Sequence, residues 1–182
     1  MKKWPHVEDD VETKIGWRTL VRKVFLQPDG KSAEYYTKER VGSRAGAVIA
    51  LTADNHVVVA EQFRPGPEKI LQDLPGGGIN PDEDAQDAVL RELKEETGYV
   101  ATGDVVYLGE VLKDAYTNTT WHFYLAKECI DSGERKLDEG EFVDVKLITI
   151  DQLLINARTA MMTDTEAVLL AYETLMSIKG RK

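Results

Sequence analysis

The chain has 182 residues, enough for one well-filled hydrophobic core and a small additional element but not for two ordinary domains. Hydrophobic residues make up 42% and charged residues 30%, which is typical of globular proteins and excludes a disordered or fibrous chain. With 23 lysines and arginines against 32 aspartates and glutamates, the net charge of −9 disfavours a nucleic-acid-binding protein that neutralises phosphates with a basic face.

Cysteine content and apolar stretches predict the compartment. The single cysteine, Cys129, cannot form an internal disulfide and favours a reducing, cytoplasmic location. The N-terminal segment lacks the apolar stretch of a signal peptide, and the longest apolar runs, Ala45–Leu51 and Val57–Ala60, are too short to span a membrane. We therefore expect a soluble cytoplasmic protein with no membrane partner.

The first elements predicted along the chain are two strands of an antiparallel β-hairpin. After ten loose polar residues, Ile15–Leu26 is rich in strand-forming residues, and Ser32–Val41 forms the second strand. Gln27–Lys31 contains a proline and a glycine at positions that favour a tight turn. A hairpin alone is marginally stable, so this one needs a surface to pack against.

Further strands and a C-terminal helix follow. Ala45–Thr52 and His56–Phe63 are almost continuously apolar, as expected for strands covered on both faces. Other strands are predicted at Val105–Val111, Trp121–Ala126 and Phe142–Ile150. The C-terminal helix is predicted over Asp164–Ser177, with Thr163 as N-cap, Glu166 at N3 and Gly180 beyond its end. Strands mixed with helices indicate an α/β or α+β sandwich.

A central helix is predicted between Asn80 and Gly98. Asn80 suits the N-cap, Pro81 the first helical position and Glu83 the third, while Gly98 suits the residue after the C-cap. At helical spacing the inner apolar stripe becomes two carboxylates in its last turns, since one face contains Ala85, Val89, Glu92 and Glu96.

These glutamates are disfavoured by every local interaction. Glu92 and Glu96 face the core, Glu95 lies beside them, and all three are at the helix C-terminus, where the helix dipole repels anions. A bound divalent cation would offset all of these costs. The alternative is a solvated helix end in which Arg91 and Lys94 neutralise the glutamates.

The surrounding sequence resembles the Nudix box, the signature of the Nudix hydrolases. The matching pattern is Gly77-x5-Glu83-x7-Arg91-Glu92-Leu93-x-Glu95-Glu96-x-Gly98-Tyr99, in which only Tyr99 departs, mildly, from the usual aliphatic residue. The resemblance implies an α+β fold, a Nudix-type α/β/α sandwich with a mixed β-sheet, preceded by the N-terminal antiparallel β-hairpin. We expect residues 1–42 to form the hairpin region and residues 43–182 the Nudix hydrolase domain.

The same resemblance implies a reaction and a set of metal ligands. Nudix hydrolases cleave a nucleoside diphosphate linked to another group, using Mg²⁺ or Mn²⁺. By position, the metal ligands would be Glu92, Glu96 and the carbonyl of Gly76, with Glu95 beside them as a candidate catalytic residue. Hard oxygen ligands of this kind suit Mg²⁺. Arg91 and Glu83 are expected to hold the loop and helix together.

Two segments resemble the ADP-ribose and nucleotide-sugar pyrophosphatase branch. In Gln62–Pro65, Arg64 would contact the substrate's phosphates or distal sugar, or else form a surface salt bridge with Glu61 or Glu68. In Asp138–Val145, a loop glutamate would be the base that activates water. We choose Glu141, with Glu139 in reserve; the alternative is a charged surface loop over Lys136–Gly140.

The hairpin has a parallel in the same branch, where it is exchanged between two subunits and its aromatic residues stack on the nucleobase. Trp17 and Tyr35 occupy comparable positions, and Arg40 is a candidate contact to phosphate or ribose. The alternative for Trp17 is a place in the core. The parallel implies a homodimer.

The predicted substrate is ADP-ribose or a related nucleoside diphosphate sugar. Lys113–Asn118 lies where ADP-ribose-specific members commonly have Ser-Pro-Gly, which argues against strict ADP-ribose selectivity. The alternatives are a Nudix hydrolase of dinucleoside polyphosphates or nucleoside triphosphates, and a Nudix-fold sensor that binds a nucleotide without cleaving it. Because sensors usually lose box glutamates, the complete box favours an enzyme.

Overall fold

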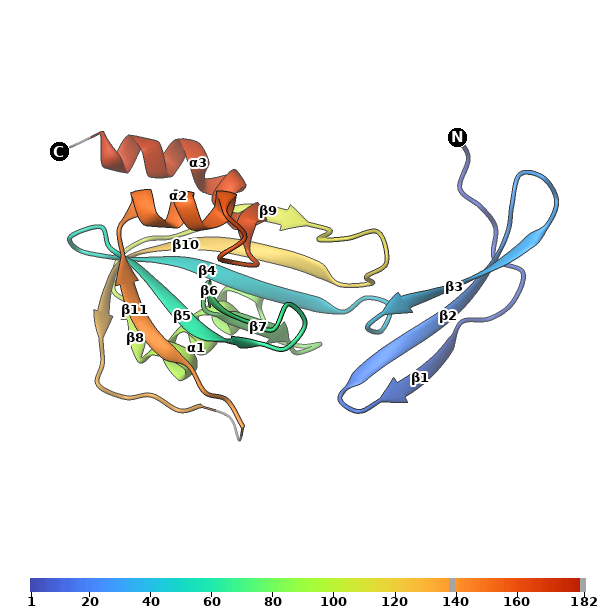
Figure 1. The fold of residues 1–182 in the computed structure, drawn as a ribbon, viewed down its shortest axis with the longest axis horizontal. Helices are drawn as coiled ribbons and strands as arrows, with labels where there is room; N and C mark the ends of the chain where they lie inside the picture. The colour runs from blue at the N-terminus through green and yellow to red at the C-terminus, as the bar shows by residue number, and fades with distance from the viewer. Residues whose placement is uncertain (138–139, 181–182) are drawn as a thin grey trace. The chain divides into compact units, whose positions relative to one another are not determined.

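The computed structural model describes residues 1–137 and 140–180, and the chain forms two compact units (Figure 1). The first unit contains Met1–Arg44 together with Leu112–Thr120, and the second contains Ala45–Val111 and Trp121–Lys182. The first unit therefore includes a segment that is distant in sequence from its three strands. No helix in the described ranges is long and apolar enough to cross a lipid bilayer.

The first unit is a three-stranded antiparallel sheet in the order β1-β2-β3. Its strands are β1 (Val11–Ile15), β2 (Arg18–Leu26) and β3 (Ser32–Lys38). The predicted hairpin is confirmed as β2 and β3, but the expected strand Ile15–Leu26 is wrong at its start, because the chain reverses at Gly16 with φ of +62°. Glycine adopts this left-handed conformation without the steric cost that a Cβ imposes.

The first unit has a small hydrophobic core. Among its described residues, the buried hydrophobic side chains are Val21 and Val24, whereas Trp17 is 78% exposed. The distant segment joins β3 through hydrogen bonds from Lys38 N to Tyr116 O at 2.7 Å and from Asn118 N to Lys38 O at 2.9 Å. These bonds extend the sheet but add little apolar burial.

The second unit is built on a sheet in the order β11-β5-β4-β10-β8, with β6 paired to β5, β7 to β4 and β9 to β10. All five pairs β5–β11, β4–β5, β5–β6, β9–β10 and β8–β10 are antiparallel, whereas β4 and β10 run in the same direction (Figure 1). The sheet is therefore mixed, as predicted. The strands are β4 (Arg44–Thr52), β5 (Val57–Arg64), β6 (Lys69–Asp73), β7 (Gly76–Ile79), β8 (Tyr99–Ala101), β9 (Val105–Val111), β10 (Thr120–Asp131) and β11 (Asp144–Ile148).

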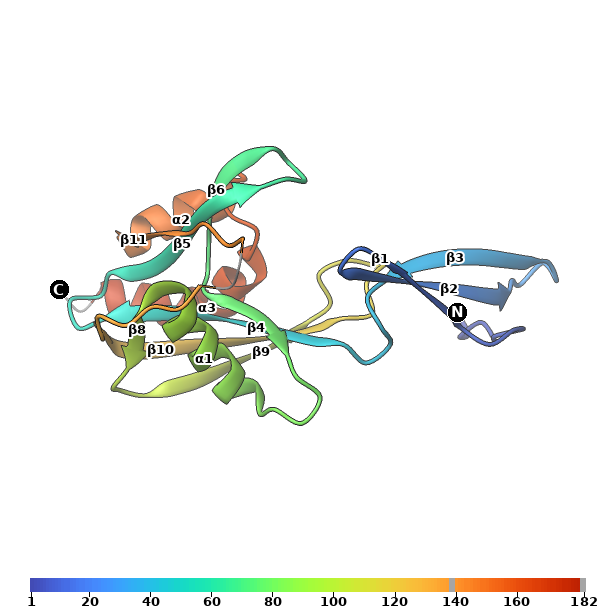
Figure 2. The ribbon, with the colours of Figure 1, turned by 90° about the horizontal axis from the view of Figure 1, so that it is seen from below.

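Helices cover both faces of this sheet. One face is covered by α1 (Ala85–Thr97), and the other by α2 (Ile150–Arg158) and α3 (Thr165–Lys179) (Figures 1 and 2). Alternate residues of β4 enter the two cores, with Ile49 on the α2–α3 side and Val48 on the α1 side. This alternation follows from the two-residue period of a strand and confirms the α/β/α sandwich.

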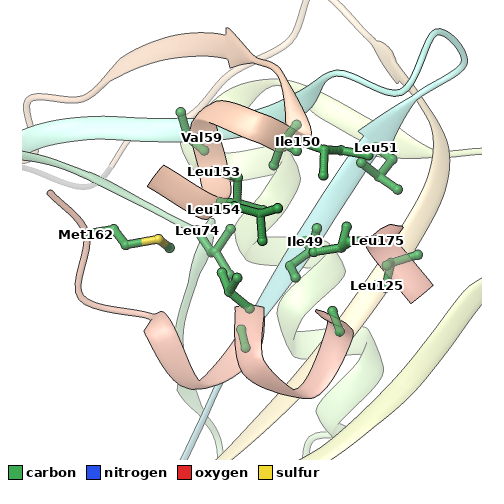
Figure 3. Packing of buried hydrophobic residues seen from close by; sticks show 14 of the residues in the cluster. Ile49, Leu51, Val59, Leu74, Leu125, Ile150, Leu153, Leu154, Met162 and Leu175 are labelled. Carbon is green, nitrogen blue, oxygen red and sulfur yellow. The ribbon is translucent and has the colours of Figure 1, made fainter. Parts of the chain in front are cut away.

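The larger core lies between the sheet and helices α2 and α3 (Figure 3). Ile49 and Leu125 from the sheet pack with Leu153 of α2 and Leu175 of α3, and each of these side chains is 0% exposed. Burying a leucine or isoleucine side chain contributes roughly 1.5–3 kcal/mol. The C-terminal helix thus covers the core, as its apolar spacing predicted.

The predicted N-caps of both helices are wrong. Helix α1 begins at Ala85, after Asp84, whose side chain accepts hydrogen bonds from the backbone N–H groups of Gln86 and Asp87. Asn80 and Glu83 form a separate turn before it, in which Glu83 N donates to Asn80 O at 3.1 Å. The C-terminal prediction is confirmed, because Gly98 ends α1 with φ of 78°.

Helix α3 begins at Thr165, with Asp164 as its N-cap residue, and Gly180 follows it as predicted. Thr163 does not cap the helix, because its hydroxyl donates to Asp73 instead. The carboxylate of Asp73, 90 residues away in the sequence, thus binds the hydroxyl that was expected to cap α3.

Candidate active site

The last turns of α1 lie against the glycine-rich strand β7. Glu96 is 9% exposed, and its Oε2 accepts a hydrogen bond from Gly76 N at 3.0 Å. Val89 and Leu93 are buried on the same helix. The core-facing position that helical spacing predicted for Glu96 is therefore observed.

Burial makes Glu96 difficult to ionise. Desolvation raises its pKa to about 8, and the negative charges of Glu92 and Glu141 act in the same direction. The Gly76 N–H and the positive charge of Arg64 act in the opposite direction. Glu96 is thus a buried acid whose carboxylate form a nearby cation would stabilise.

Arg91 connects three glutamates. Its Nη1 donates to Glu92 Oε1 at 2.9 Å and to Glu95 Oε2 at 2.8 Å, and its Nε donates to Glu83 Oε1 at 2.9 Å. The bond from Arg91 is the main reason that the pKa of Glu83 falls to about 2. For Glu92, burial raises the pKa although Arg91 opposes the shift. Arg91 and Glu83 thus join the turn before α1 to the helix.

A Cβ atom on either of the first two glycines of β7 would come too close to a neighbouring group. A Cβ on Gly76 would lie 2.2 Å from Gly46 O, and a Cβ on Gly77 would lie 2.7 Å from Glu92 Oε1. A Cβ on Gly78 would meet nothing within 4 Å. Gly76 therefore allows β7 to pack on β4, and Gly77 leaves space for the Glu92 carboxylate.

Arg64 is at the end of β5 and has a buried partner. Its Nε donates to Asp73 Oδ2 at 2.6 Å; the Arg64 side chain is 40% exposed and that of Asp73 1%. The alternative partners Glu61 and Glu68 are therefore wrong. Arg64 is also close enough to Glu96 for its charge to lower the pKa of that group.

Glu141 lies near the α1 glutamates, since its charge raises the pKa of both Glu92 and Glu96. Its reserve, Glu139, is outside the described residues. Five residues before Glu141, Lys136 N donates a hydrogen bond to the Glu95 carbonyl oxygen at 3.1 Å. Glu141 also lines a cavity of about 360 Å³, together with Glu61, Gln62, Phe63, Ile70, Leu137, Phe142, Val143 and Asp144.

The other three candidates belong to the first unit. Trp17 lies in the turn between β1 and β2 rather than in the core, and the Arg18 guanidinium is 4.0 Å from its ring centroid. Tyr35 on β3 packs edge-on against Phe25, with ring centroids 5.9 Å apart. Arg40 forms an ion pair with Glu12 at 3.2 Å.

A family model described as NUDIX domain matches residues 42–170. The chain belongs to the Nudix family. The resemblance to the Nudix family that was inferred from the box is thus confirmed, and so is the prediction of a Nudix hydrolase.

Relatives of this Nudix chain include proteins with different names. It is 32% identical over 143 residues to the methanol dehydrogenase activator of Bacillus methanolicus, covering 78% of this chain and 76% of that protein. It is 31% identical over 128 residues to the ADP-ribose pyrophosphatase of Bacillus subtilis (strain 168), covering 70% and 68%. A crystal structure of an ADP compounds hydrolase covers 100% of this chain and 98% of that chain with a TM-score of 0.80; at 21% identity it shows the shared fold.

Nudix hydrolases generally use divalent metals, and the residues around Glu96 fit such an ion. Glu92 and Glu96 provide hard carboxylate oxygens that are costly to bury without a cation. As the side chains lie, no group of three or more His, Cys, Asp or Glu within residues 1–137 and 140–180 is arranged to hold a metal. Since Mg²⁺ usually takes one or two carboxylates and completes its shell with water and substrate phosphate, two glutamates are sufficient.

Gly77→Ala tests the space reserved for Glu92. Because the new Cβ would meet the movable end of the Glu92 side chain, we expect the fold to survive and the carboxylate to shift. The concentration of divalent metal needed for half-maximal activity should rise about tenfold. Gly78→Ala is the matched control and should behave like the wild type, because its Cβ would lie in open space. Equal metal requirements in the two variants would contradict this role of Gly77.

Asp73 is a neighbour of the site that was not predicted from the sequence. Asp73 follows an ordinary-looking strand, and its partners Arg64 and Thr163 are 9 and 90 residues away. The one local feature that could have indicated its role is its position two residues before Pro75, just before the glycines Gly76–Gly78.

Proposed function

We propose that this Nudix hydrolase cleaves the diphosphate bond of ADP-ribose or a related nucleoside diphosphate sugar, with Mg²⁺ or Mn²⁺ as cofactor. The products would be a nucleoside monophosphate and a sugar phosphate. The observation that carries the proposal is the buried Glu96 beside Glu92 and the Gly76 N–H, with Arg64 and Glu141 close enough to act on Glu96 electrostatically. The Bacillus subtilis ADP-ribose pyrophosphatase, at 31% identity, supports the choice of substrate.

In this proposal the side chains of Glu92 and Glu96 and the carbonyl of Gly76 hold the metal. Such an ion neutralises a diphosphate and makes a water molecule more acidic. Arg91 keeps Glu92 in place and ties Glu95, a further candidate catalytic residue, to the same helix turn. A bound cation would allow Glu92 and Glu96 to stay ionised although burial raises the pKa of both.

Arg64 and Glu141 have the remaining roles. Arg64 binds the negatively charged phosphates, for which a guanidinium is suited by its planar array of donors. Glu141 accepts the proton of the attacking water, because it is a carboxylate near both metal-binding glutamates. Glu139 remains the reserve for this step.

A substrate panel tests the proposal. The purified protein with Mg²⁺ would be given ADP-ribose, GDP-mannose, UDP-glucose and a dinucleoside polyphosphate, and products would be identified by mass. We expect AMP and ribose phosphate from ADP-ribose, with slower cleavage of other nucleotide sugars. Preference for the dinucleoside polyphosphate would favour the alternative Nudix substrate, and tight binding of ADP-ribose without cleavage would identify a sensor.

We also propose that the active form is a homodimer in which the first unit completes the substrate site of a second copy, and that it acts in the cytoplasm. Support for the dimer comes from the small core of that unit and the exposed Trp17. Buried, unpaired Cys129 is consistent with a reducing compartment.

The dimer proposal predicts a mass near twice that of one chain in size-exclusion chromatography with light scattering. Trp17→Ala should raise KM for ADP-ribose about tenfold, because an aromatic stacking partner would be lost, without dissociating the dimer. An active monomer would contradict the swapped arrangement and the roles of Trp17, Tyr35 and Arg40 in binding substrate.

A further inference from the structure

Three side chains from separate segments of the second unit form a chain that ends at Arg64. Asp73, the last residue of β6, is 1% exposed. Its Oδ2 accepts the bond from Arg64 Nε at 2.6 Å. Its Oδ1 accepts two bonds from Thr163, one from the backbone N at 3.1 Å and one from Oγ1 at 2.8 Å.

Thr163 is itself held in place. It lies in the segment between α2 and α3, next to Asp164, and the Asp164 side chain accepts a hydrogen bond from Leu74 N at 3.1 Å. Two successive residues of this segment therefore bond two successive residues, Asp73 and Leu74, that lead into the glycine run. Because a buried carboxylate is costly unless its oxygens are bonded, the observed orientation of Asp73 is strongly preferred.

A fixed Asp73 restricts Arg64. The guanidinium is planar and has five N–H donors in a rigid fork, so binding its Nε–H to an immobile oxygen limits where the terminal NH2 groups can point. The Arg64 side chain is 40% exposed and can still reach a ligand. Less side-chain freedom is then lost when the ligand binds.

We propose that Asp73, oriented by Thr163, is a positioning residue that presents Arg64 to the diphosphate of the substrate. The segment between α2 and α3 thereby influences substrate binding through Asp73. The inference depends on the proposed function, because it requires Arg64 to bind substrate phosphate.

Asp73→Asn tests the inference with little change of shape. The amide oxygen can still accept both bonds from Thr163, whereas the amide nitrogen that faces Arg64 Nε cannot accept a hydrogen bond. We expect KM for ADP-ribose to rise about tenfold, as for loss of a hydrogen bond to a charged group, with kcat changed less than twofold. The Mg²⁺ requirement and Mn²⁺ binding measured by calorimetry should stay unchanged.

A double-mutant cycle separates positioning from a purely structural role. Arg64→Ala should raise KM at least as much as Asp73→Asn, and adding Asp73→Asn to Arg64→Ala should raise it no further. A further tenfold rise in the double variant would overturn the inference. If Arg64→Ala raises KM and Asp73→Asn does not, the positioning role alone fails. If Arg64→Ala leaves KM unchanged, the substrate-binding role of Arg64 fails and the inference falls with it.

Substitutions of Thr163 give a second test that does not alter the buried charge. Thr163→Val removes the hydroxyl but keeps the branched shape and the backbone N–H, so KM should rise about threefold. Thr163→Ser keeps the hydroxyl and should restore a KM close to that of the wild type. Thermal unfolding of each variant checks the fold. Equal KM values for the two Thr163 variants would contradict the proposal even if Asp73→Asn failed to fold.

Discussion

Glu96→Gln should abolish most of the hydrolytic activity and at the same time stabilise the metal-free protein above pH 8. The activity should fall because a neutral amide is a poor ligand for Mg²⁺, and we expect kcat to decrease about a thousandfold. The stability should rise because the substitution removes a carboxylate that burial makes costly to ionise. Opposite effects on activity and stability are what a functional, locally unfavourable residue should show.

The pH dependence follows from the pKa of Glu96, which is about 8 in the folded protein against a reference value of 4.5. Between these two values the folded state binds more protons than the unfolded state, so stability falls as pH rises. The contribution is fully present below about pH 4.5 and is lost as pH passes through 8. Because a tenfold change in an ionisation constant corresponds to about 1.4 kcal/mol, the loss amounts to several kcal/mol in the metal-free protein.

The measurement is the urea midpoint of metal-free protein between pH 5 and pH 9, with Mn²⁺ binding followed separately by calorimetry. Wild-type protein should lose stability across this range, and Glu96→Gln should lose less of it and bind Mn²⁺ weakly. Glu173→Gln, at an exposed position on α3, is the control for removing one negative charge. Full activity of Glu96→Gln, or a pH profile identical to that of the wild type, would show that Glu96 is not the buried metal ligand.

The sequence predicted the buried position of Glu96 and the end of α1 because the information for both is local. Helical spacing alone identified Glu96 as core-facing, and Gly98 was identified as the helix end from its tolerance of a left-handed backbone, observed at φ 78°. The start of α1 was predicted four residues too early. Asn80 and Asp84 are both residue types that favour the N-cap position. Asp84 caps the helix, whereas the backbone N–H of Asn80 donates to Glu83 Oε2 in a turn before it.

Features that depend on long-range contacts were not predicted. Strand β7 consists of Gly76–Ile79, and three successive glycines have low strand propensity; the strand exists because Gly76 fits against Gly46 of β4. The bonds from Thr163 to Asp73 cross 90 residues, and no local pattern distinguishes this threonine from an N-cap. The short helix Ile150–Arg158 was not predicted, and its first residue, Ile150, had been assigned to the preceding strand.

Glu141→Gln should lower kcat by about 10²–10⁴-fold, because a glutamine cannot accept the proton of the attacking water. The charge of Glu141 raises the pKa of Glu92 and Glu96 but also attracts a cation bound beside them, so the two effects of its removal on metal binding oppose each other. The expected result is therefore slow turnover with a Mn²⁺ affinity within about tenfold of the wild type. Loss of Mn²⁺ binding would instead make Glu141 a metal ligand.

The companion variant Glu139→Gln decides between the two loop glutamates. If Glu141 is the base, Glu139→Gln should retain kcat within about threefold of the wild type, since a nearby charge that does not accept the proton contributes only a weak, screened interaction. A large loss in Glu139→Gln with little change in Glu141→Gln would reverse the assignment. A large loss of kcat in both variants would indicate that the two glutamates act together. Two carboxylates that share one proton titrate as a pair, so the loss of either would impair proton transfer.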